Sequence, residues 1–320
     1  MKSCFTVVSM LLLLTGVAAA QPYPARAIRF VLPYAPGGGT DLTARPIAVK
    51  LSEIVGKPVV IDNRPGGAGM IGADIVAKSA PDGYTVLVSA ASEMSMNLML
   101  FKEMTYDPVK DFLPVTLATT TPAILLVHPS VPFKSVKELV AYAKAKPSAL
   151  SYASVGTGSP MHFAGELFNS MVKIKMVHVP YKGAAPALVD LLGGHVPAGF
   201  VTLLAGMPHL KSGKLRALGV TSAQRSSALP EVPAIAEAGL PGFDIVQWFA
   251  LWVPAQTPKP VIDKLNSELV KIIQSREYKQ RMVESGTEAV GGTPGELAAF
   301  QKSEIDKYRK IAAVAGIKPE

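Results

Sequence analysis

Three glycine-rich segments of the chain have the residue types to hold a small anion. Each follows an apolar run and precedes a stretch with helical spacing: residues 33–41 (PYAPGGGTD), 63–69 (NRPGGAG) and 154–162 (SVGTGSPMH). Glycine lets a ligand approach backbone N–H groups closely, and the start of a helix favours negative charge. Segments 33–41 and 154–162 therefore predict an anion site, with a plain tight turn as the alternative. Segment 63–69 supports both interpretations equally.

Polar side chains in the first and third segments add hydrogen-bonding groups. Thr40 or Asp41 can cap the helix that follows the first segment. Thr157 and Ser159 supply hydroxyls that both donate and accept. His162 lies just inside the helix after the third segment, where a lone histidine is either a ligand contact or a structural residue.

A fourth segment, residues 178–185 (HVPYKGAA), also precedes a predicted helix. Tyr181 and Gly183 are candidates to line the same site. Lys182 is either a counter-ion for the anion or a solvated surface residue. Since ligands of open α/β sheets bind beyond the carboxyl ends of strands, all these loops can meet in one cleft.

Catalytic patterns are missing from the sequence. The glycine spacing is neither G-x-G-x-x-G nor a P-loop, and no G-x-S-x-G or H-E-x-x-H is present. The five histidines are spread along the chain without metal-like pairs, and nothing points to paired catalytic carboxylates. We therefore expect a binding protein without metal or cofactor. The rival is an exported hydrolase or isomerase, for which His162 is the one good candidate base.

Composition limits the class of protein. The chain has 320 residues, of which 49% are hydrophobic and 18% charged, so we expect two folded domains and exclude general disorder. The net charge of +8 suits a small anionic ligand or an acidic partner. Because the basic residues are scattered, nucleic-acid binding is not expected.

The first twenty residues have the pattern of a signal peptide. Lys2 precedes an apolar run at residues 5–17, and Ala18, Ala19 and Ala20 form a cleavage signal before Gln21. We therefore expect export and cleavage near Ala20/Gln21. The single cysteine, Cys4, lies in this segment, so the mature chain excludes disulfides, cysteine-ligated metals and cysteine nucleophiles.

Strand-like and helix-like stretches alternate through the mature chain. Strands are predicted at residues 28–32, 59–61, 85–88, 123–127, 150–153, 176–179, 196–201, 216–220 and 243–253. Helices are predicted at residues 40–55, 70–78, 135–146, 160–171, 184–192, 258–275 and 293–313. Such alternation is typical of an α/β fold with parallel sheets covered by helices.

Taken together, the motifs resemble the Bug/TctC family of periplasmic substrate-binding proteins of tripartite tricarboxylate transporters. The resemblance covers the mature chain in order. It is carried by YAPGGGTD, NRPGGAG, PDGY at residues 81–84, YDP and KDF at residues 106–112, SVGTGSPMH, VPYKG at residues 179–183, GKLRAL at residues 213–218, and residues 248–258.

The resemblance implies a type II-like, two-domain "Venus flytrap" fold, in which each domain has a mainly parallel sheet flanked by helices. Domain I would comprise residues 21–122 and 244–320, and domain II residues 123–243. A carboxylate would be shared between the two glycine-rich loops. By matching motif, the implied contacts are Tyr34, Pro36, Gly37, Gly38, Thr40, Asp41, Thr157, Gly158, Ser159 and His162, with Tyr181 and Gly183 nearby.

Departures from the family pattern bear on the ligand. Pro197 and Val201 stand where the family has acidic residues, one of which would take an ammonium group, so a plain or aromatic carboxylate is expected rather than an amino acid. Ala250 and Gln256 stand where glycine is common, near the crossing between domains. The implied partners are membrane permease subunits, with a sensor pathway as the alternative. The receptor itself is expected to be a monomer.

Overall fold

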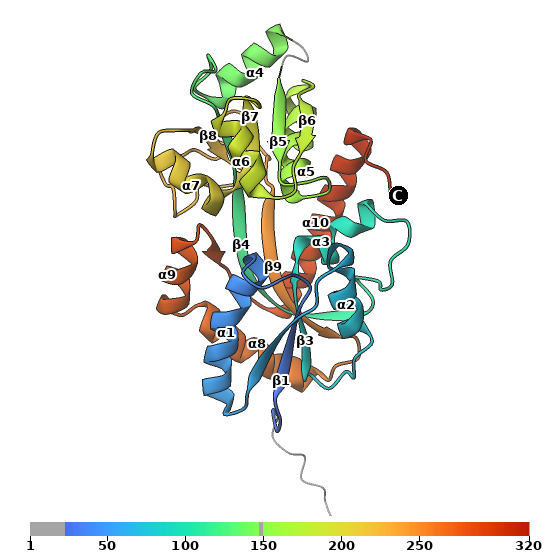
Figure 1. Ribbon diagram of the computed structural model, residues 1–320. Coiled ribbons are helices and arrows are strands. Elements are labelled where there is room, and N and C mark those ends of the chain that lie inside the picture. Colours follow the sequence, from blue (N-terminus) through green and yellow to red (C-terminus); the bar gives the residue numbers. More distant parts are fainter. Residues whose placement is uncertain (1–22, 147–149, 320) are drawn as a thin grey trace, which may run out of the picture.

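A computed structural model describes residues 23–146 and 150–319, so the predicted signal peptide lies outside the described residues. The strands form one ten-stranded mixed sheet with helices on both faces (Figure 1). The path through the sheet runs β2-β1-β3-β9-β4-β7-β5-β6, with β8 and the two-residue β10 (Glu288–Ala289) both paired to β4. Within these described ranges, no helix is both long and apolar enough to cross a membrane.

One end of the sheet carries the first glycine-rich loop. Here β1 (Ile28–Leu32) pairs in parallel with both β2 (Val59–Asn63) and β3 (Thr85–Ala90). The helices of this part are α1 (Gly39–Val55), α2 (Met70–Ala77), α3 (Ala91–Met94), α8 (Lys259–Ile273) and α9 (Arg276–Glu284), with short 3-10 turns η1 (Gly67–Gly69) and η2 (Met96–Met99). The predicted β-α-β-α-β order is confirmed.

The other end of the sheet carries the second loop. There β5 (Ser151–Ser154) pairs in parallel with β6 (Val177–Pro180) and β7 (Ala198–Thr202), and β8 (Arg216–Val220) lies beside β4. The helices of this part are α4 (Val136–Ala145), α5 (Pro160–Val172), α6 (Ala184–Leu192) and α7 (Leu203–Lys211).

Two long antiparallel strands join these ends. β4 (Phe112–Val127) and β9 (Val246–Pro254) pair with each other from Phe112↔Pro254 to Pro122↔Val246, and only then does β4 pair with β7 and β8. β9 is almost wholly buried, and its two indoles donate to Glu304 Oε2 at 3.1 Å and to Ser89 Oγ at 2.8 Å. These strands connect the two parts of the sheet.

Two of the three hydrophobic clusters follow the same division. One lies wholly at the α1–α8 end and includes Phe30 and Leu269, and another at the α6–α7 end includes Leu191 and Val220. The third and largest extends across both parts. It includes α10 (Pro294–Ala315), whose Tyr308 ring lies 5.1 Å from the ring of Phe163.

Several sequence predictions of elements need correction. The strand expected at residues 123–127 is the end of the 16-residue β4, because the Thr- and Pro-rich stretch before it lacks a strand-like apolar pattern. Helix α7 was not predicted, since Gly206 and Pro208 lie inside it. The helix expected at residues 258–275 ends at Ile273, and a separate α9 begins after Ser275, whose hydroxyl accepts from the Tyr278 amide at 3.2 Å.

Gln256 adopts a backbone conformation that favours glycine, with φ of 69° in the turn after β9. A non-glycine residue there carries strain of about 1–2 kcal/mol. We therefore expect Gln256→Gly to leave the free energy of unfolding unchanged or to raise it by up to ~1 kcal/mol in urea titrations. The matched change Gln224→Gly, in an exposed loop without positive φ, should lower it by roughly 0.5 kcal/mol. A larger loss at Gln256 than at Gln224 would contradict the strain argument.

Candidate ligand-binding site

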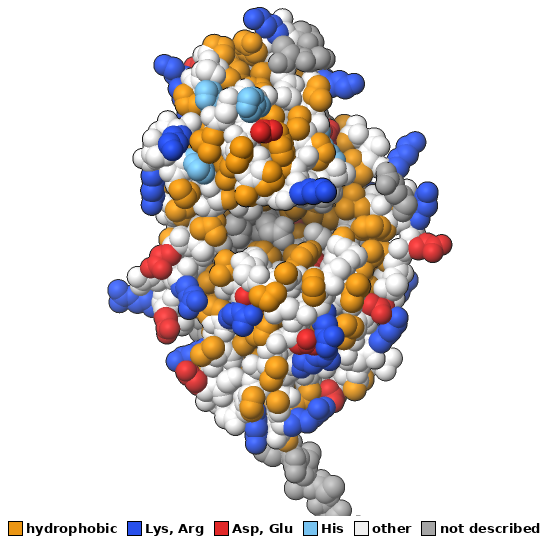
Figure 2. Space-filling view, viewed as in Figure 1, with side chains coloured by type: hydrophobic (Ala, Val, Ile, Leu, Met, Phe, Trp, Pro, Cys, Tyr) orange, Lys and Arg blue, Asp and Glu red, His pale blue; other side chains and the backbone are white. Residues whose placement is uncertain are grey.

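A cleft of about 430 Å³ lies between the two ends of the sheet. The molecule is hollowed there, with apolar side chains around the opening (Figure 2). Five of the residues expected from sequence line it: Tyr34, Gly37, Gly38, Thr40 and Ser159. The other expected residues, Pro36, Asp41, Thr157, Gly158, His162, Tyr181 and Gly183, lie outside the lining.

The three consecutive glycines of the first loop have different reasons to be glycine. Gly37 has φ of +87°, and a Cβ on Gly39 would lie 2.5 Å from Cζ of Phe249. Gly38, the N-cap of α1, has φ of −79°, and its nearest neighbour to a Cβ would be the Ala35 carbonyl oxygen at 3.8 Å. Neither backbone nor packing requires glycine at position 38. Glycine suits the N-cap position and also leaves the start of the helix open.

The start of α1 offers backbone donors to this cleft. Among the described residues no side chain caps the helix, so the first-turn amides, including those of Gly39 and Thr40, have no intrahelical acceptor. Thr40 is only 2% exposed and lines the cleft. The macrodipole of this 17-residue helix adds partial positive charge at the same place, so the arrangement suits a carboxylate.

Asp41 lies outside the cleft lining and is hydrogen-bonded to the first loop and its neighbours. Its Oδ2 accepts from the Gly37 amide at 3.0 Å and from Arg45 Nε at 2.7 Å, and Asn63 donates to Oδ1 at 3.5 Å. Burial alone would raise the pKa of Asp41, but the hydrogen bonds from Arg45 and Gly37 outweigh it and lower the pKa. Asp41 therefore stays ionised and holds the turn in place.

Segment 63–69 also serves this structural purpose. Asn63 donates to the Tyr34 carbonyl oxygen at 2.9 Å, and Arg64 Nε bonds both oxygens of Asp62 at 2.9 and 3.1 Å. A Cβ on Gly72 of α2 would lie 2.8 Å from the Pro33 Cα, so the helix that follows segment 63–69 packs closely against the first loop. Of the two interpretations left open by the sequence, the contacts support the structural turn.

In the second glycine-rich loop, most hydrogen-bond donors bond to acceptors within the loop itself or in the first turn of α5. Ser159 Oγ donates to the Gly156 carbonyl oxygen at 2.6 Å and accepts from the His162 amide at 3.2 Å, so this hydroxyl is the N-cap of α5. The Gly158 amide donates to His162 Nδ1 at 3.1 Å. Ser159 also lines the cleft, and its hydroxyl donates to Gly156 in this structure. Met161, which sequence reasoning missed, lines the cleft on the first turn of α5.

A stack of rings holds this loop from the side. The His162 and His178 rings lie 4.0 Å apart at 10°, and Tyr152 stacks on His178 at 5.0 Å. His178 Nε2 is 2.7 Å from Ser154 Oγ, which in turn accepts from the Gly156 amide at 3.1 Å. Burial lowers the pKa of both histidines to about 4, so the rings are neutral at pH 7 and His162 Nδ1 can accept.

Tyr181 and Gly183 lie outside the cleft lining and are hydrogen-bonded to the second loop. The Gly183 amide donates to the Val155 carbonyl oxygen at 3.2 Å, and the Tyr181 amide donates to Ser154 at 3.1 Å. The Tyr181 hydroxyl bonds Asp190 Oδ2 at 2.5 Å, while Lys182 is exposed outside the cleft lining. This segment thus fixes the second loop, and Lys182 is a surface residue.

Glu93 lies behind the first loop and was missed from sequence. It is fully buried, and its Oε2 accepts from the Ala90 amide at 3.2 Å. Burial raises its pKa to about 8, so at neutral pH it is mostly protonated. Ala90 and Ser92 line the cleft beside Tyr34, whose pKa is raised by burial and by Glu93. A neutral Glu93 places no negative charge beside a bound carboxylate.

The rest of the lining comes from segments far apart in the sequence. Thr121 and Gln247 are register partners on β4 and β9, and Phe249 follows two residues later. The remaining lining residues are Gly39, Leu42, Thr43, Val155, Pro160, Thr202, Leu204, Met282, Ser285 and Thr287. Among the described residues none with a charged side chain lines the cleft.

Pro197 and Val201, where the family has acidic residues, both lie outside the cleft lining. Val201 is fully buried in the cluster with Ile124 and Leu191, and the next residue, Thr202, lines the cleft. The loss of an acidic side chain at Val201 therefore does not by itself explain the uncharged lining. Within residues 23–146 and 150–319, no group of His, Cys, Asp or Glu side chains is arranged to hold a metal ion.

Two α/β units joined by a pair of crossing strands, with a cleft between them, are an architecture that this chain shares with solved solute-binding proteins. The family model described as "Tripartite tricarboxylate transporter family receptor" (TctC) matches residues 43–317, and the chain belongs to this family. BugT of Bordetella pertussis is 36% identical, over 99% of both chains.

Solved structures agree with the family assignment. R. palustris Rpa4515 with adipate is 38% identical, with a TM-score of 0.80, over 93% of this chain and 100% of that one. MatC from Rhodopseudomonas palustris with bound malate is 32% identical, with a TM-score of 0.74, over 90% and 99% of the two chains. The two-domain fold predicted from sequence is confirmed, with a mixed sheet because β4 and β9 run antiparallel.

Proposed function

We propose that the protein captures a small carboxylate in its cleft and delivers it to the membrane permease subunits of a tripartite tricarboxylate-type transporter. The uncharged lining beside the uncapped start of α1 carries this proposal. Charge-assisted hydrogen bonds contribute roughly 1.5–3 kcal/mol each, so a few of them reach micromolar affinity, about −8 kcal/mol. Adipate and malate in related structures support the ligand class.

The contacts divide the expected residues into two groups. Tyr34, Gly38 and Thr40 would face the ligand from domain I, and Met161 would offer its backbone amide from domain II. The remaining expected residues position the loops: Pro36, Gly37, Asp41, Thr157, Gly158, Ser159, His162, Tyr181 and Gly183. A plain or aromatic carboxylate fits the apolar part of the lining, where Phe249 and Leu204 lie.

Domain boundaries at residues 122/123 and 243/244 fit this function. They fall where β4 changes partners from β9 to β7, and just before β9 begins. Each domain would then contribute one glycine-rich loop to one carboxylate, and closure would enclose it. We further propose cleavage near Ala20/Gln21, a periplasmic monomer, and no catalysis.

The first test is a thermal-shift screen of ligand-stripped protein against adipate, malate, benzoate and an amino acid. We expect at least one plain or aromatic carboxylate to raise the melting temperature by several degrees, because a ligand at 100 Kd stabilises by ~2.7 kcal/mol. Isothermal titration then gives the affinity. No response to any carboxylate would contradict the proposal.

A second measurement separates the receptor from the rival enzyme. The best ligand should be recovered chemically unchanged after incubation with the protein over many equivalents. Multiple-turnover conversion that His162→Ala abolishes would favour the hydrolase or isomerase. A neighbouring sensor kinase in place of permease genes would favour the signalling receptor.

A further inference from the structure

A second groove of about 410 Å³ lies at the crossing between the domains. Thr120, Pro122 and Val246 line it, whereas the adjacent residues Thr121 and Gln247 line the ligand cleft. Successive side chains of a strand point to opposite faces. The groove and the cleft therefore lie on opposite faces of the two crossing strands, β4 and β9.

A carboxylate bridges this groove. Glu288 Oε1 accepts from the Ser227 amide at 2.9 Å, from Ser227 Oγ at 2.7 Å and from Ser226 Oγ at 3.4 Å. Glu288 lies on β10 (Glu288–Ala289), which pairs with Thr119 and Thr120 of β4 in domain I. Ser226 and Ser227 follow β8 in domain II, so these bonds join the two domains.

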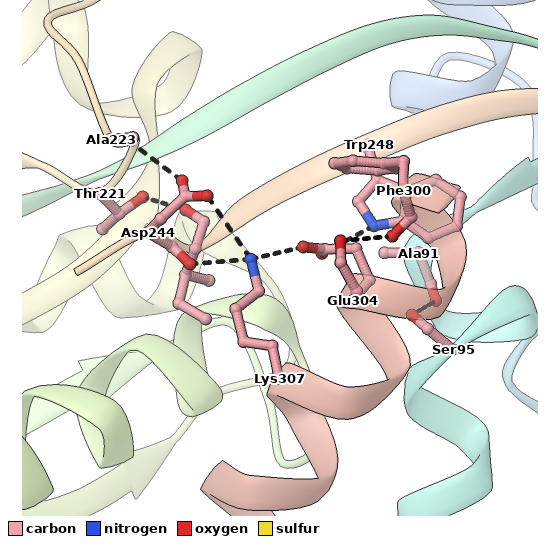
Figure 3. A network of polar contacts seen from close by, with 11 residues as sticks. Ala91, Ser95, Thr221, Ala223, Asp244, Trp248, Phe300, Glu304 and Lys307 are labelled. Carbon is pink, nitrogen blue, oxygen red and sulfur yellow. Dashed lines mark hydrogen bonds and ion pairs between the residues drawn. The ribbon is translucent and has the colours of Figure 1, made fainter. Parts of the chain in front are cut away.

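A second set of contacts spans the same groove (Figure 3). Asp244 Oδ1 accepts from the Ala223 amide of domain II at 3.1 Å, and Lys307 of α10 donates to the Asp244 carbonyl oxygen at 2.9 Å. Lys307 Nζ also pairs with Glu304 Oε1 at 2.5 Å, and Glu304 accepts from the Trp248 indole. The loop at residues 222–227 is thus tied to domain I at two places.

We propose that the bonds between Glu288 and Ser226–Ser227 hold the domains apart on the cleft side and so weaken ligand binding; the inference rests on the proposed carboxylate receptor. Because the groove and the cleft are on opposite faces of the crossing, a rotation that narrows the cleft widens the groove. The bridging bonds must then stretch or break. They stabilise the wider cleft and oppose closure, although they lie away from the ligand.

Removing the bridge should therefore tighten binding. The apparent Kd of a ligand that needs the closed state equals the intrinsic Kd divided by the closed fraction. Losing the bonds of one carboxylate corresponds to about a three- to tenfold change in that fraction, as long as the closed state is the minor one. The change appears as slower ligand dissociation, because the closed complex persists for longer.

The experiment compares Glu288→Ala with Glu237→Ala by isothermal titration, using the carboxylate chosen by the thermal-shift screen. Glu237 is a matched control, because its carboxylate bonds Arg225 Nε at 2.8 Å entirely within domain II. We expect Glu288→Ala to bind about three- to tenfold tighter than the wild type, and Glu237→Ala to bind like it. Ser227→Ala, which loses only the hydroxyl bond, should tighten binding about twofold.

Ligand-free melting temperature distinguishes this device from a purely structural contact. Glu288→Ala should melt at or slightly below the wild-type temperature while it binds more tightly, which simple loss of stability cannot produce. Unchanged or weaker binding in both Glu288→Ala and Ser227→Ala, with a wild type that binds, would overturn the hinge inference and leave the proposed receptor intact.

A measurement without ligand keeps the inference testable if no carboxylate binds the wild type. The chain without residues 1–20 contains no cysteine, so Val49→Cys on α1 and Lys211→Cys at the end of α7 can carry two spin labels. Both positions are exposed. In double electron–electron resonance, the population with the shorter label-to-label distance should be larger in Glu288→Ala than in Glu237→Ala. Identical distance distributions in the two variants would refute the inference that the Glu288 bonds oppose closure.

Discussion

Gly38→Val is expected to weaken carboxylate binding at least tenfold, a loss of ~1.4 kcal/mol or more. The valine is compatible with the fold, because Gly38 has extended backbone and a Cβ would meet only the Ala35 carbonyl oxygen at 3.8 Å. Its side chain would instead project over the amides at the start of α1, where the ligand carboxylate is proposed to sit. Isothermal titration with the selected ligand measures the effect.

Gly38→Ala provides a graded control. With one methyl group it should cost less affinity than valine, and both variants should melt within a few degrees of the wild type, since a poorer N-cap costs only ~1 kcal/mol. The hydroxyl variant Ser159→Ala answers a different question. It removes the cap of α5 and should lower stability by about 1 kcal/mol even without ligand. Wild-type affinity in folded Gly38→Val would place the ligand elsewhere.

The fold was predictable because each domain repeats short-range patterns. Strand β1, helix α1 and their glycine-rich turn occupy consecutive residues, and the same order recurs at β5 and α5. The crossing strands were predicted only in part. In β4, residues such as Thr116 and Thr119 are buried by distant partners, and no local apolar alternation marks them.

The cleft lining was predictable where consecutive residues supply it, and less so where strand pairing brings distant residues together. Gly38 and Thr40 were found because consecutive glycines before a helix mark accessible amides. Thr121 and Gln247 belong to the site only because they are paired across β4 and β9 and face the cleft, a relation that the sequence does not display. The sequence did not point to Glu93, because the raised pKa of this residue depends on its burial in the folded protein.

The ring stack under the second loop is expected to make the protein sensitive to acid. In the unfolded chain a histidine binds a proton near pH 6.5, whereas His162 and His178 in the folded chain do so only near pH 4. The unfolded state therefore binds more protons between these values, and stability falls as the pH drops from 6.5 towards 4. At pH 5 the loss is on the order of 2 kcal/mol for His162 and smaller for His178, because solvent reaches the partly exposed His178 ring and screens its charge.

Variants isolate this contribution, because Glu93 has a raised pKa of about 8 and changes stability in the opposite direction as the pH falls. Urea unfolding at pH 7.5 and pH 5 should show a smaller loss for His178→Gln than for the wild type, and an unchanged loss for His209→Gln, which lies on α7 outside the stack. Ligand affinity should fall with stability, since a protonated His162 Nδ1 can no longer accept from the Gly158 amide. Equal losses in wild type and His178→Gln would show that the stacked rings do not titrate as the geometry requires.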